Sequence, residues 1–436
     1  MSAVIEQRFK AQLQQMPEPK RWLIGHSGGL DSQVLLHLAS KILPPDRLLV
    51  VHINHHLQQP ADSWAAFSLS QAELLGLKHT TLDVYPKSDS EDDARRARYA
   101  AFDSIMTGGD CLLLAHHGDD QVETLLFRLL RGAGLKGLSG IPKHRDLASG
   151  KLYRPLLATT RQELEAYAEQ HGLQWVSDPS NQSDLYDRNF LRLKIVPLLE
   201  QRWPGFRQQG LATVEQLRAS HRLLDEYLDR DLAALIGAMG ELQIVPMAGF
   251  SEERQHHLLR RWVELGGGLL LNKTQLLEIQ KTLIAARVDA QPQLRLGDLV
   301  VRRYQQALYL TERETLEPLN LSELSLGEHV LGDGCLLVES EETGLKTLDG
   351  IYLERRKGGE RCRPVGRSGS CTVKKLLQEA GIPPWLKAHW PLLKSDDEVV
   401  AVPGICVCEN WDTKNGGFNV SWHSFALSRT RSFGIL

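Results

Sequence analysis

Cysteine is scarce in this sequence and long apolar runs are missing from it. Only six of its 436 residues are cysteines, spread from Cys111 to Cys408, which is too sparse for a disulfide framework. No stretch approaches the ~18–20 consecutive apolar residues of a membrane-spanning helix. The polar first twenty residues also lack the apolar core of a secretory signal. We therefore expect a soluble, cytoplasmic protein.

A large excess of charge of either sign is lacking too. Lys and Arg number 51 against 54 Asp and Glu, a formal net charge of −3, so the whole chain carries no general attraction to nucleic acid. The charges are unevenly distributed along the chain. Residues 355–375, RRKGGERCRPVGRSGSCTVKK, hold eight basic residues and one acidic residue, Glu360. This basic window has a local charge of +7.

The first part of the chain has a regular alternation. Apolar runs, 26 to 32 residues apart, start at Arg21, Arg47, His79 and Cys111. Between them lie helical patterns over 32–43, 62–75, 91–107 and 119–131. Nearly continuous apolar strands are typical of a sheet covered on both faces. The pattern predicts a doubly wound, parallel α/β domain.

Later segments change character. Thr160-Arg-Gln-Glu163 is a capping box that opens another helix, and the segment from Arg188 is predicted to be helical until Pro197 weakens it. The chain then becomes mainly helical, and the last ~90 residues mix short strands with one helix. We predict three domains: an α/β domain over 1–212, a mainly helical domain over 213–340 and a small α+β domain over 345–436.

The junction of the first predicted strand and helix reads Ser27-Gly28-Gly29-Leu30-Asp31-Ser32. Glycines allow a close backbone approach to a ligand, and free N–H groups at a helix start attract anions. The segment is not a Walker A loop, because GxxxxGK[ST] is absent. An aspartate beside a phosphate suggests a metal-bridged pyrophosphate. A tight turn with an N-cap is the simpler interpretation, but all six residues at this junction favour phosphate binding.

SGGLDS at this position resembles the PP-loop of the ATP-pyrophosphatases, which adenylate an oxygen and release pyrophosphate. Further motifs follow in order: VVHINHHLQ, EDDARRARYAAF, AHHGDDQVETLLFRLLRGAGLKGLSG and RNFLRLKIVPLL. Together with the helical and α+β regions they are similar to the tRNA(Ile)-lysidine synthetases of the longer, three-domain bacterial type. The resemblance covers essentially the whole chain and is weaker in RRKGGERCRP and KKLLQEAGIPPWLKAHWPLL.

The resemblance implies a ligase that uses ATP, Mg²⁺, L-lysine and a tRNA(Ile) with a CAU anticodon. In the implied first step, the C2 oxygen of the wobble cytidine attacks the α-phosphate of ATP and releases pyrophosphate. The ε-amine of lysine then displaces AMP at C2 and forms lysidine. No membrane partner is expected, and the sequence leaves monomer and homodimer open.

The resemblance also assigns ATP-binding residues. These are Ser27, Gly28, Gly29, Leu30, Asp31 and Ser32, with Asp31 serving Mg²⁺ through the pyrophosphate. His52, at the end of the second predicted strand, is a further candidate near the adenine, since ligands of α/β sheets bind at this edge. For His55 and His56 an ordinary loop is at least as good an interpretation.

His116 and Asp120 are the predicted catalytic pair. If the chain is already helical at His116, residues four apart lie on one face. One would orient the lysine amine, and the other would coordinate Mg²⁺ or accept the proton of the amine, because ammonium with a reference pKa near ~10.4 is not nucleophilic. An N-cap aspartate with ordinary polar histidines is the alternative. His117 and Asp119 are interpreted as structural neighbours.

Arginines complete the predicted site. Arg188 matches the basic residue that follows the flexible loop of the family and would neutralise phosphate charge during adenylation. Arg192 is a weaker candidate one turn later, assigned to tRNA. In the basic window we predict tRNA contacts at Arg355, Arg356, Arg361 and Arg363. Neighbouring residues on a strand point to opposite faces, so only one of the first two is expected to face RNA.

Three other functions share part of this pattern. A tRNA 2-thiocytidine enzyme relies on cysteines, whereas the predicted α/β domain has only Cys111. Cys406-x-Cys408 lies in an apolar strand pattern and is interpreted as a pair of buried or incidental thiols. A PP-loop synthetase acting on a small metabolite would not need the basic window. An RNA-binding module without catalysis would not need Asp31, His116 and Asp120 together.

Overall fold

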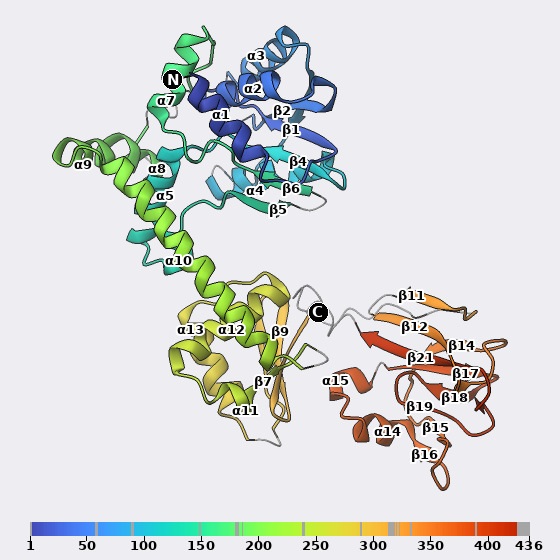
Figure 1. Ribbon diagram of the computed structural model, residues 1–436. Coiled ribbons are helices and arrows are strands. Elements are labelled where there is room, and N and C mark those ends of the chain that lie inside the picture. Colours follow the sequence, from blue (N-terminus) through green and yellow to red (C-terminus); the bar gives the residue numbers. More distant parts are fainter. Residues whose placement is uncertain are drawn as a thin grey trace. The chain divides into compact units, whose positions relative to one another are not determined.

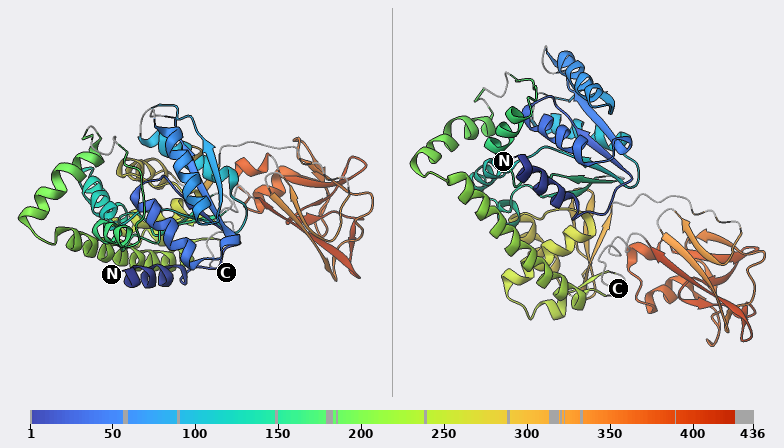
Figure 2. Two further views of the ribbon diagram at one scale, coloured as in Figure 1. Left: turned by 90° about the horizontal axis from the view of Figure 1, so that it is seen from above. Right: turned by 45° about the horizontal axis from the view of Figure 1, so that its top comes forward.

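The computed structural model describes residues 2–56, 60–88, 91–147, 150–178, 183–184, 186–237, 240–287, 290–312, 319, 321, 323–331, 334–388 and 390–424. It divides into two compact units, Met1–Leu223 and Leu224–Leu436, and the boundary falls inside the long helix α10 (Phe206–Leu235; Figures 1 and 2). The three predicted domains stay a prediction, and residues 425–436 of the third lie outside the described residues. Within the described ranges, no helix is long and apolar enough to cross a membrane.

The first unit is built on a six-stranded sheet of order β3-β2-β1-β4-β6-β5, parallel except for the β5–β6 hairpin. Its strands are β1 (Arg21–Gly25), β2 (Leu48–Asn54), β3 (Lys78–Asp83), β4 (Asp110–Leu113), β5 (His144–Leu147) and β6 (Gly150–Tyr153). The four predicted strands are confirmed. The hairpin was not predicted, because HRDL and GKLY are short and partly polar.

Helices cover both faces of this sheet, as the apolar strands require. They are α1 (Ser2–Leu13), α2 (Leu30–Ile42), α3 (Ala61–Leu74), α4 (Glu91–Ile105), α5 (Gly118–Leu130), α6 (Leu135–Leu138) and α7 (Arg161–Gln170). Ile24 and Val50 belong to the core beneath α1, α2 and α7, whereas Leu23 and Val51 belong to the core beneath α4. Successive strand residues thus alternate between the two cores.

The parallel strands bring several loops to one edge of the sheet. The segments that follow β1, β2 and β4 all leave from the carboxyl ends of neighbouring strands. Ligands of doubly wound sheets bind at such an edge. The phosphate loop, His55 and His116 therefore come together although they are far apart in sequence.

The helical segment that begins at Asp187 continues past Pro197. It consists of α8 (Asp187–Phe190), the π-helical turn η3 (Leu191–Ile195) and α9 (Val196–Arg202). The prediction that the helix weakens at Pro197 is wrong in position: the irregular turn precedes the proline, with Val196 N–H donating to the Leu191 carbonyl. Pro197 lies at the start of α9, where a missing N–H costs least.

The second unit begins with helices that pack on an antiparallel sheet of order β7-β10-β9-β8. These elements are α11 (Ile244–Met247), α12 (Glu252–Gly267), α13 (Lys273–Glu278), η4 (Ile279–Ile284), β7 (Leu242–Gln243), β8 (Gln293–Leu296), β9 (Leu299–Tyr304) and β10 (Ala307–Glu312). Trp262 is fully buried in their common core. The mainly helical character of this region is confirmed.

The remainder is α+β, as predicted, with two larger antiparallel sheets, β11-β12-β21-β13-β20 and β14-β17-β18-β19, and the pair β15-β16. The strands are β11 (Gly327–Leu331), β12 (Gly334–Glu341), β13 (Gly344–Leu345), β14 (Tyr352–Arg355), β15 (Arg361–Cys362), β16 (Cys371–Thr372), β17 (Pro391–Ser395), β18 (Glu398–Val402), β19 (Cys406–Val407), β20 (Asp412–Thr413) and β21 (Gly417–Ser424). Helices α14 (Val373–Glu379) and α15 (Pro384–Lys387) complete it. All six cysteines are free thiols, and Cys408 is buried in this core.

The predicted capping box of α7 is present and gives a first test of the fold. Thr160 Oγ1 accepts from Glu163 N–H, and Glu163 accepts from Thr160 N–H at 2.7 Å. We expect Thr160→Ala to lower the free energy of unfolding by about 1 kcal/mol, measured by urea denaturation. Thr213→Ala is the control, because this exposed hydroxyl only donates to Gln209 within α10. An equal loss in both variants would contradict a specific role for the cap.

Candidate active site

A cavity of about 490 Å³ opens at the carboxyl edge of the six-stranded sheet. Its volume lies in the range of small-molecule and cofactor sites. Among the residues that line it are Ser27, Gly29, Asp31, Ser32, His52, His55, His56, Arg98, His116 and Asp120. The cavity therefore unites the predicted phosphate loop with the predicted catalytic pair.

The phosphate loop has the backbone geometry that its glycines predict. Gly28 has φ +86°, and a Cβ there would lie 2.8 Å from Val176 Cγ2. Ser27 N–H donates to Ser32 Oγ at 3.2 Å, and that hydroxyl donates to the Gly29 carbonyl at 2.9 Å. No side chain of the described residues caps α2 at Gly29. The N–H groups of its first turn are thus available to an anion.

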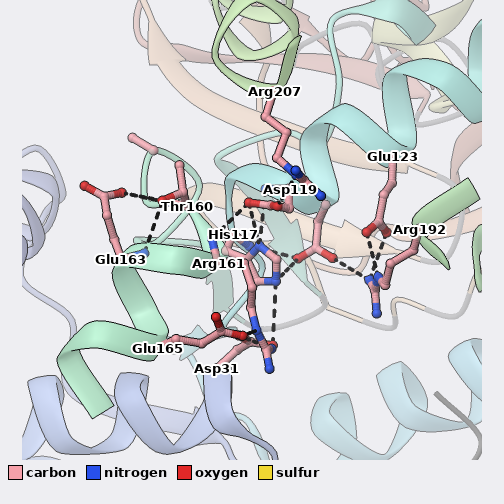
Figure 3. Close-up of polar contacts among 12 residues, drawn as sticks. Asp31, His117, Asp119, Glu123, Thr160, Arg161, Glu163, Glu165, Arg192 and Arg207 are labelled. Atoms are coloured by element: carbon pink, nitrogen blue, oxygen red, sulfur yellow. Dashed lines mark hydrogen bonds and ion pairs between the residues drawn. The ribbon is translucent and has the colours of Figure 1, made fainter. Parts of the chain in front are cut away.

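Asp31 is held by a cation from another helix (Figure 3). Arg161 Nη1 donates to both of its carboxylate oxygens, at 2.8 and 2.9 Å, and His117 Nε2 lies 3.6 Å from Oδ2. Burial raises the pKa of Asp31, and the charges of His117 and Arg161 oppose that rise. The arginine thus helps to keep a carboxylate ionised in a desolvated place.

Arg161 links α7 to α5 as well. Its backbone N–H donates to Asp119 Oδ1 at 2.9 Å, and Asp119 Oδ2 forms an ion pair with Arg207 Nε at 2.8 Å. Sequence reasoning missed Arg161 as a site residue. The capping box placed it at the first position of a helix, but its partner Asp31 is 130 residues away, and no local pattern connects the two.

Helix α5 begins at Gly118, with His117 as its N-cap. His117 Nδ1 accepts from Asp119 N–H, and His117 N–H donates to Asp120 Oδ2 at 2.9 Å. Both residues thus take part in the start of the helix, and their interpretation as structural neighbours stays a prediction. His116 lies before the helix, so the condition under which it would share a helix face with Asp120 is not met, although both line the cavity.

The protonation of this pair is set by burial and by neighbouring charge. Burial lowers the pKa of His116 to about 3, and its Nδ1 has no hydrogen-bond partner within the described part of the chain. Burial alone would raise the pKa of Asp120, but His117 and His116 lower it below its usual value. At neutral pH a neutral imidazole therefore lies beside a carboxylate.

Arg192 is engaged with acidic side chains inside this unit (Figure 3). Its Nε and Nη2 donate to the two oxygens of Glu123 at 2.6 and 2.8 Å, and Nη2 lies 3.4 Å from Asp120 Oδ1. Glu123 was not predicted as a site residue. Arg188 lies on α8, 6.0 Å from the centre of the Phe127 ring, and is not among the residues that line the cavity.

Three histidines, His52, His55 and His56, line the end of the cavity near β2. His52 Nδ1 donates to the His26 carbonyl at 2.9 Å, and burial lowers the pKa of His52. Burial also lowers the pKa of His55 to about 4, with Arg98 acting in the same direction. His56 has φ 52° and stacks on Tyr85 with ring centres 5.1 Å apart. The neutral rings of His52 and His55 suit a base better than a phosphate.

The arginines of the basic window differ in their availability. Arg356 Nε donates to Glu360 at 3.1 Å and its Nη1 to the Lys387 carbonyl at 2.8 Å, which leaves 10% of the side chain exposed. Arg361 is exposed and donates to Ser370. Arg363 is exposed and forms no hydrogen bond or ion pair through its side chain with the described residues.

Mg²⁺ stays a prediction, and the described residues are compatible with one way of binding it. No group of three or more His, Cys, Asp or Glu among the described residues could hold a metal ion. Mg²⁺ is commonly bound by one or two carboxylates plus substrate phosphates. Asp31, beside the phosphate loop, fits that mode because an ionised carboxylate has lone pairs beyond those used by Arg161.

A phosphate loop at the start of a helix, at the edge of a doubly wound sheet and beside a histidine–aspartate pair, defines a nucleotide-dependent enzyme of the PP-loop class. Three family models match the sequence. The PP-loop domain model matches residues 1–199, the TilS substrate-binding domain model matches residues 242–309, and the TilS C-terminal domain model matches residues 351–422. These matches cover all three predicted regions.

Two relatives extend along nearly the whole chain. The tRNA(Ile)-lysidine synthase of Coxiella burnetii is 38% identical over 413 residues, 91% of this chain and 92% of its own. That of Serratia proteamaculans is 38% identical over 427 residues, 94% and 97% of the two chains. The chain belongs to the tRNA(Ile)-lysidine synthase family.

Solved structures give more distant likenesses. The U34-tRNA thiolase NcsA of Methanococcus maripaludis, with its [4Fe-4S] cluster, is 18% identical with a TM-score of 0.41, over 50% of this chain and 79% of its own. A TilS C-terminal domain is 17% identical with a TM-score of 0.18, over 24% of this chain and 91% of its own.

The pairing of Arg161 with Asp31 predicts a pH-dependent stability difference. Without Arg161 the pKa of Asp31 should rise further, and above that pKa the variant holds an uncompensated buried carboxylate. We expect Arg161→Gln to cost about 1–2 kcal/mol at pH 7 and less at an acidic pH at which more of Asp31 is protonated. Urea denaturation at the two pH values measures this.

The control places the same substitution in an Asp31→Asn background. There the extra cost at pH 7 should vanish, because no carboxylate remains to be compensated. A cost that is independent of pH in both backgrounds would show that Arg161 stabilises the fold through other contacts, such as its pair with Glu165.

Proposed function

We propose that this protein joins the ε-amine of L-lysine to C2 of the wobble cytidine in a tRNA(Ile) with a CAU anticodon, using ATP. The observation that carries the proposal is the shared cavity of the phosphate loop, His116 and Asp120 in a chain of this family. In the first step the C2 oxygen bonds to the α-phosphorus and pyrophosphate leaves. In the second, the lysine nitrogen bonds to C2 and AMP leaves.

ATP binds with its pyrophosphate on the loop. Backbone N–H groups around Gly28, Gly29 and Leu30, with the hydroxyls of Ser27 and Ser32, surround the departing charge. Asp31 would hold Mg²⁺ against the pyrophosphate oxygens, and the ion supplies charge neutralisation when bound. His52 and the other uncharged rings near β2 contact the adenine.

Lysine enters as an ammonium ion, so it must bind and then lose a proton. Asp120 is ionised in the cavity and binds the ammonium group. His116 is neutral at physiological pH, and phosphates brought beside it raise its proton affinity. It is therefore the group we assign to take the proton of the amine. Arg192, through Glu123 and its contact with Asp120, positions that carboxylate.

Arg188 keeps its proposed role as a partner of phosphate charge in adenylation. Because it lies on α8 outside the lining of the cavity, this role requires an approach of its side chain when substrates bind. In the basic window, Arg355, Arg361 and Arg363 are proposed to contact tRNA. Arg356 supports the loop that carries them through Glu360.

The test is nucleoside mass analysis of CAU-anticodon tRNA incubated with ATP and lysine. We expect lysidine with the wild-type protein and a loss of at least 100-fold with Asp31→Asn, since a charge-stabilising group at a transferring phosphate contributes about 10²–10³ in rate. His116→Ala should retain more pyrophosphate release than lysidine formation, because its role lies in the second step. Absence of lysidine with the wild-type protein would contradict the function.

The basic window is tested through the salt dependence of tRNA binding. Arg361→Ala with Arg363→Ala should lower the slope of log affinity against log salt by about 1.4–1.8, at roughly 0.7–0.9 for each lost phosphate contact. Arg367→Ala is the matched control, because Glu379 already neutralises that arginine. An unchanged slope in the double variant would identify the window as a solvated surface.

A further inference from the structure

Four arginines surround Tyr99 at the border of the cavity. Arg95 and Arg98 share α4 with it, Arg145 lies on β5, and Arg154 directly follows β6. The Cζ atoms of Arg145, Arg95 and Arg98 lie 4.1, 5.4 and 5.8 Å from the centre of the Tyr99 ring. Arg154 Nη2 donates to the Tyr99 hydroxyl at 3.4 Å. We call these four residues the Tyr99 arginine cluster.

Three members of the cluster lack the carboxylates that accompany other arginines of this unit. Arg161 and Arg192 each meet an acidic side chain, whereas Arg95, Arg145 and Arg154 form no ion pair with any described residue. Arg154 is only 2% exposed, and its Nε has no hydrogen-bond partner in that part of the chain. Its Nη1 donates to the Pro142 carbonyl at 2.7 Å, which does not neutralise its charge. A buried guanidinium group without a carboxylate partner is unfavourable, so the arrangement is complementary to an anion from outside.

The positive charge of the cluster shifts the pKa values of neighbouring groups. Burial would raise the pKa of Tyr99, but the charges of Arg154, Arg95, Arg98 and Arg145 lower it below its usual value. His116 experiences three of the same charges. The cluster therefore acts on the catalytic pair as well as on its own tyrosine.

The place of the cluster indicates the shape of its ligand. Arg98 lines the cavity, while Arg145 is half-buried on β5, the edge strand of the sheet. The cluster thus extends from the cavity to β5, the last strand on one side of the sheet. The nucleotide pyrophosphate already has a separate site on the loop before α2. A chain that inserts one nucleotide into the cavity must bring its flanking phosphates out of it, and the cluster offers them a cationic path.

We propose that the Tyr99 arginine cluster binds the phosphodiester groups of the RNA chain next to the nucleotide that enters the cavity. The proposal rests on the proposed function and adds a second anion site to it. Guanidinium groups suit this ligand because they bond two phosphate oxygens at once and stack on rings. The phosphates of ATP are the other source of the same chemistry, and the experiment separates the two.

The experiment measures binding of a labelled CAU-anticodon stem-loop to the full-length protein by fluorescence anisotropy, from 50 to 200 mM salt and without ATP. Arg145→Gln and Arg95→Gln should each weaken binding about fivefold at 0.1 M salt and lower the salt slope by about 0.7. Arg145→Lys should restore the slope, since it keeps the charge. The KM for ATP should stay within twofold of the wild-type value.

Arg96→Gln is the matched control, because Arg96 is exposed on the same helix and pairs with Asp93. It should bind the stem-loop like the wild-type protein. Unchanged slopes in both cluster variants would overturn the proposal. So would a raised KM for ATP with unaltered RNA affinity, which would assign the cluster to the nucleotide. Failure of the proposed function would appear separately, as absence of lysidine with the wild-type protein.

Discussion

The bond from Arg161 Nη1 to both carboxylate oxygens of Asp31 is the contact on which the site geometry depends. Asp31 lies in the first turn of α2, whereas Arg161 opens α7, and the Arg161 backbone N–H also binds Asp119 in α5. One residue therefore joins the starts of three helices. Through these contacts Arg161 links the phosphate loop to the helix that carries Asp120.

Acidic, neutral and basic side chains occupy different places in and around the cavity. Asp31 and Glu123, each desolvated, are met by an arginine that favours the ionised form. His52 and His55 are kept neutral by burial. Arg95, Arg145 and Arg154, near Tyr99, form no ion pair with a described residue. Carboxylates, neutral rings and guanidinium groups thus occupy separate places in and around the cavity, in keeping with the proposed binding of an ammonium group, a base and a phosphate chain.

The sequence predicted those parts of the fold and site that have local signatures. The four apolar strands, the helices between them, the Ser27–Ser32 loop and the capping box at Thr160 each depend on neighbouring residues, and all four features are present. Arg161 and Glu123 could not be found in this way, since their partners lie far along the chain. The β5–β6 hairpin escaped prediction because an edge pair of short strands needs little apolar character.

The π-helical turn at Leu191–Ile195 has a consequence for how this chain can vary in length. A π turn holds one residue more than an α turn over the same rise. Deleting a single residue there would convert it to a regular α turn, because the i to i+5 step of a π turn and the i to i+4 step of an α turn sweep nearly the same angle. Arg188 and Pro197 would then keep nearly the same directions relative to each other. The turn can therefore lose one residue without changing the faces of α8 and α9, whereas a deletion within regular α-helix would rotate one side against the other by about 100°.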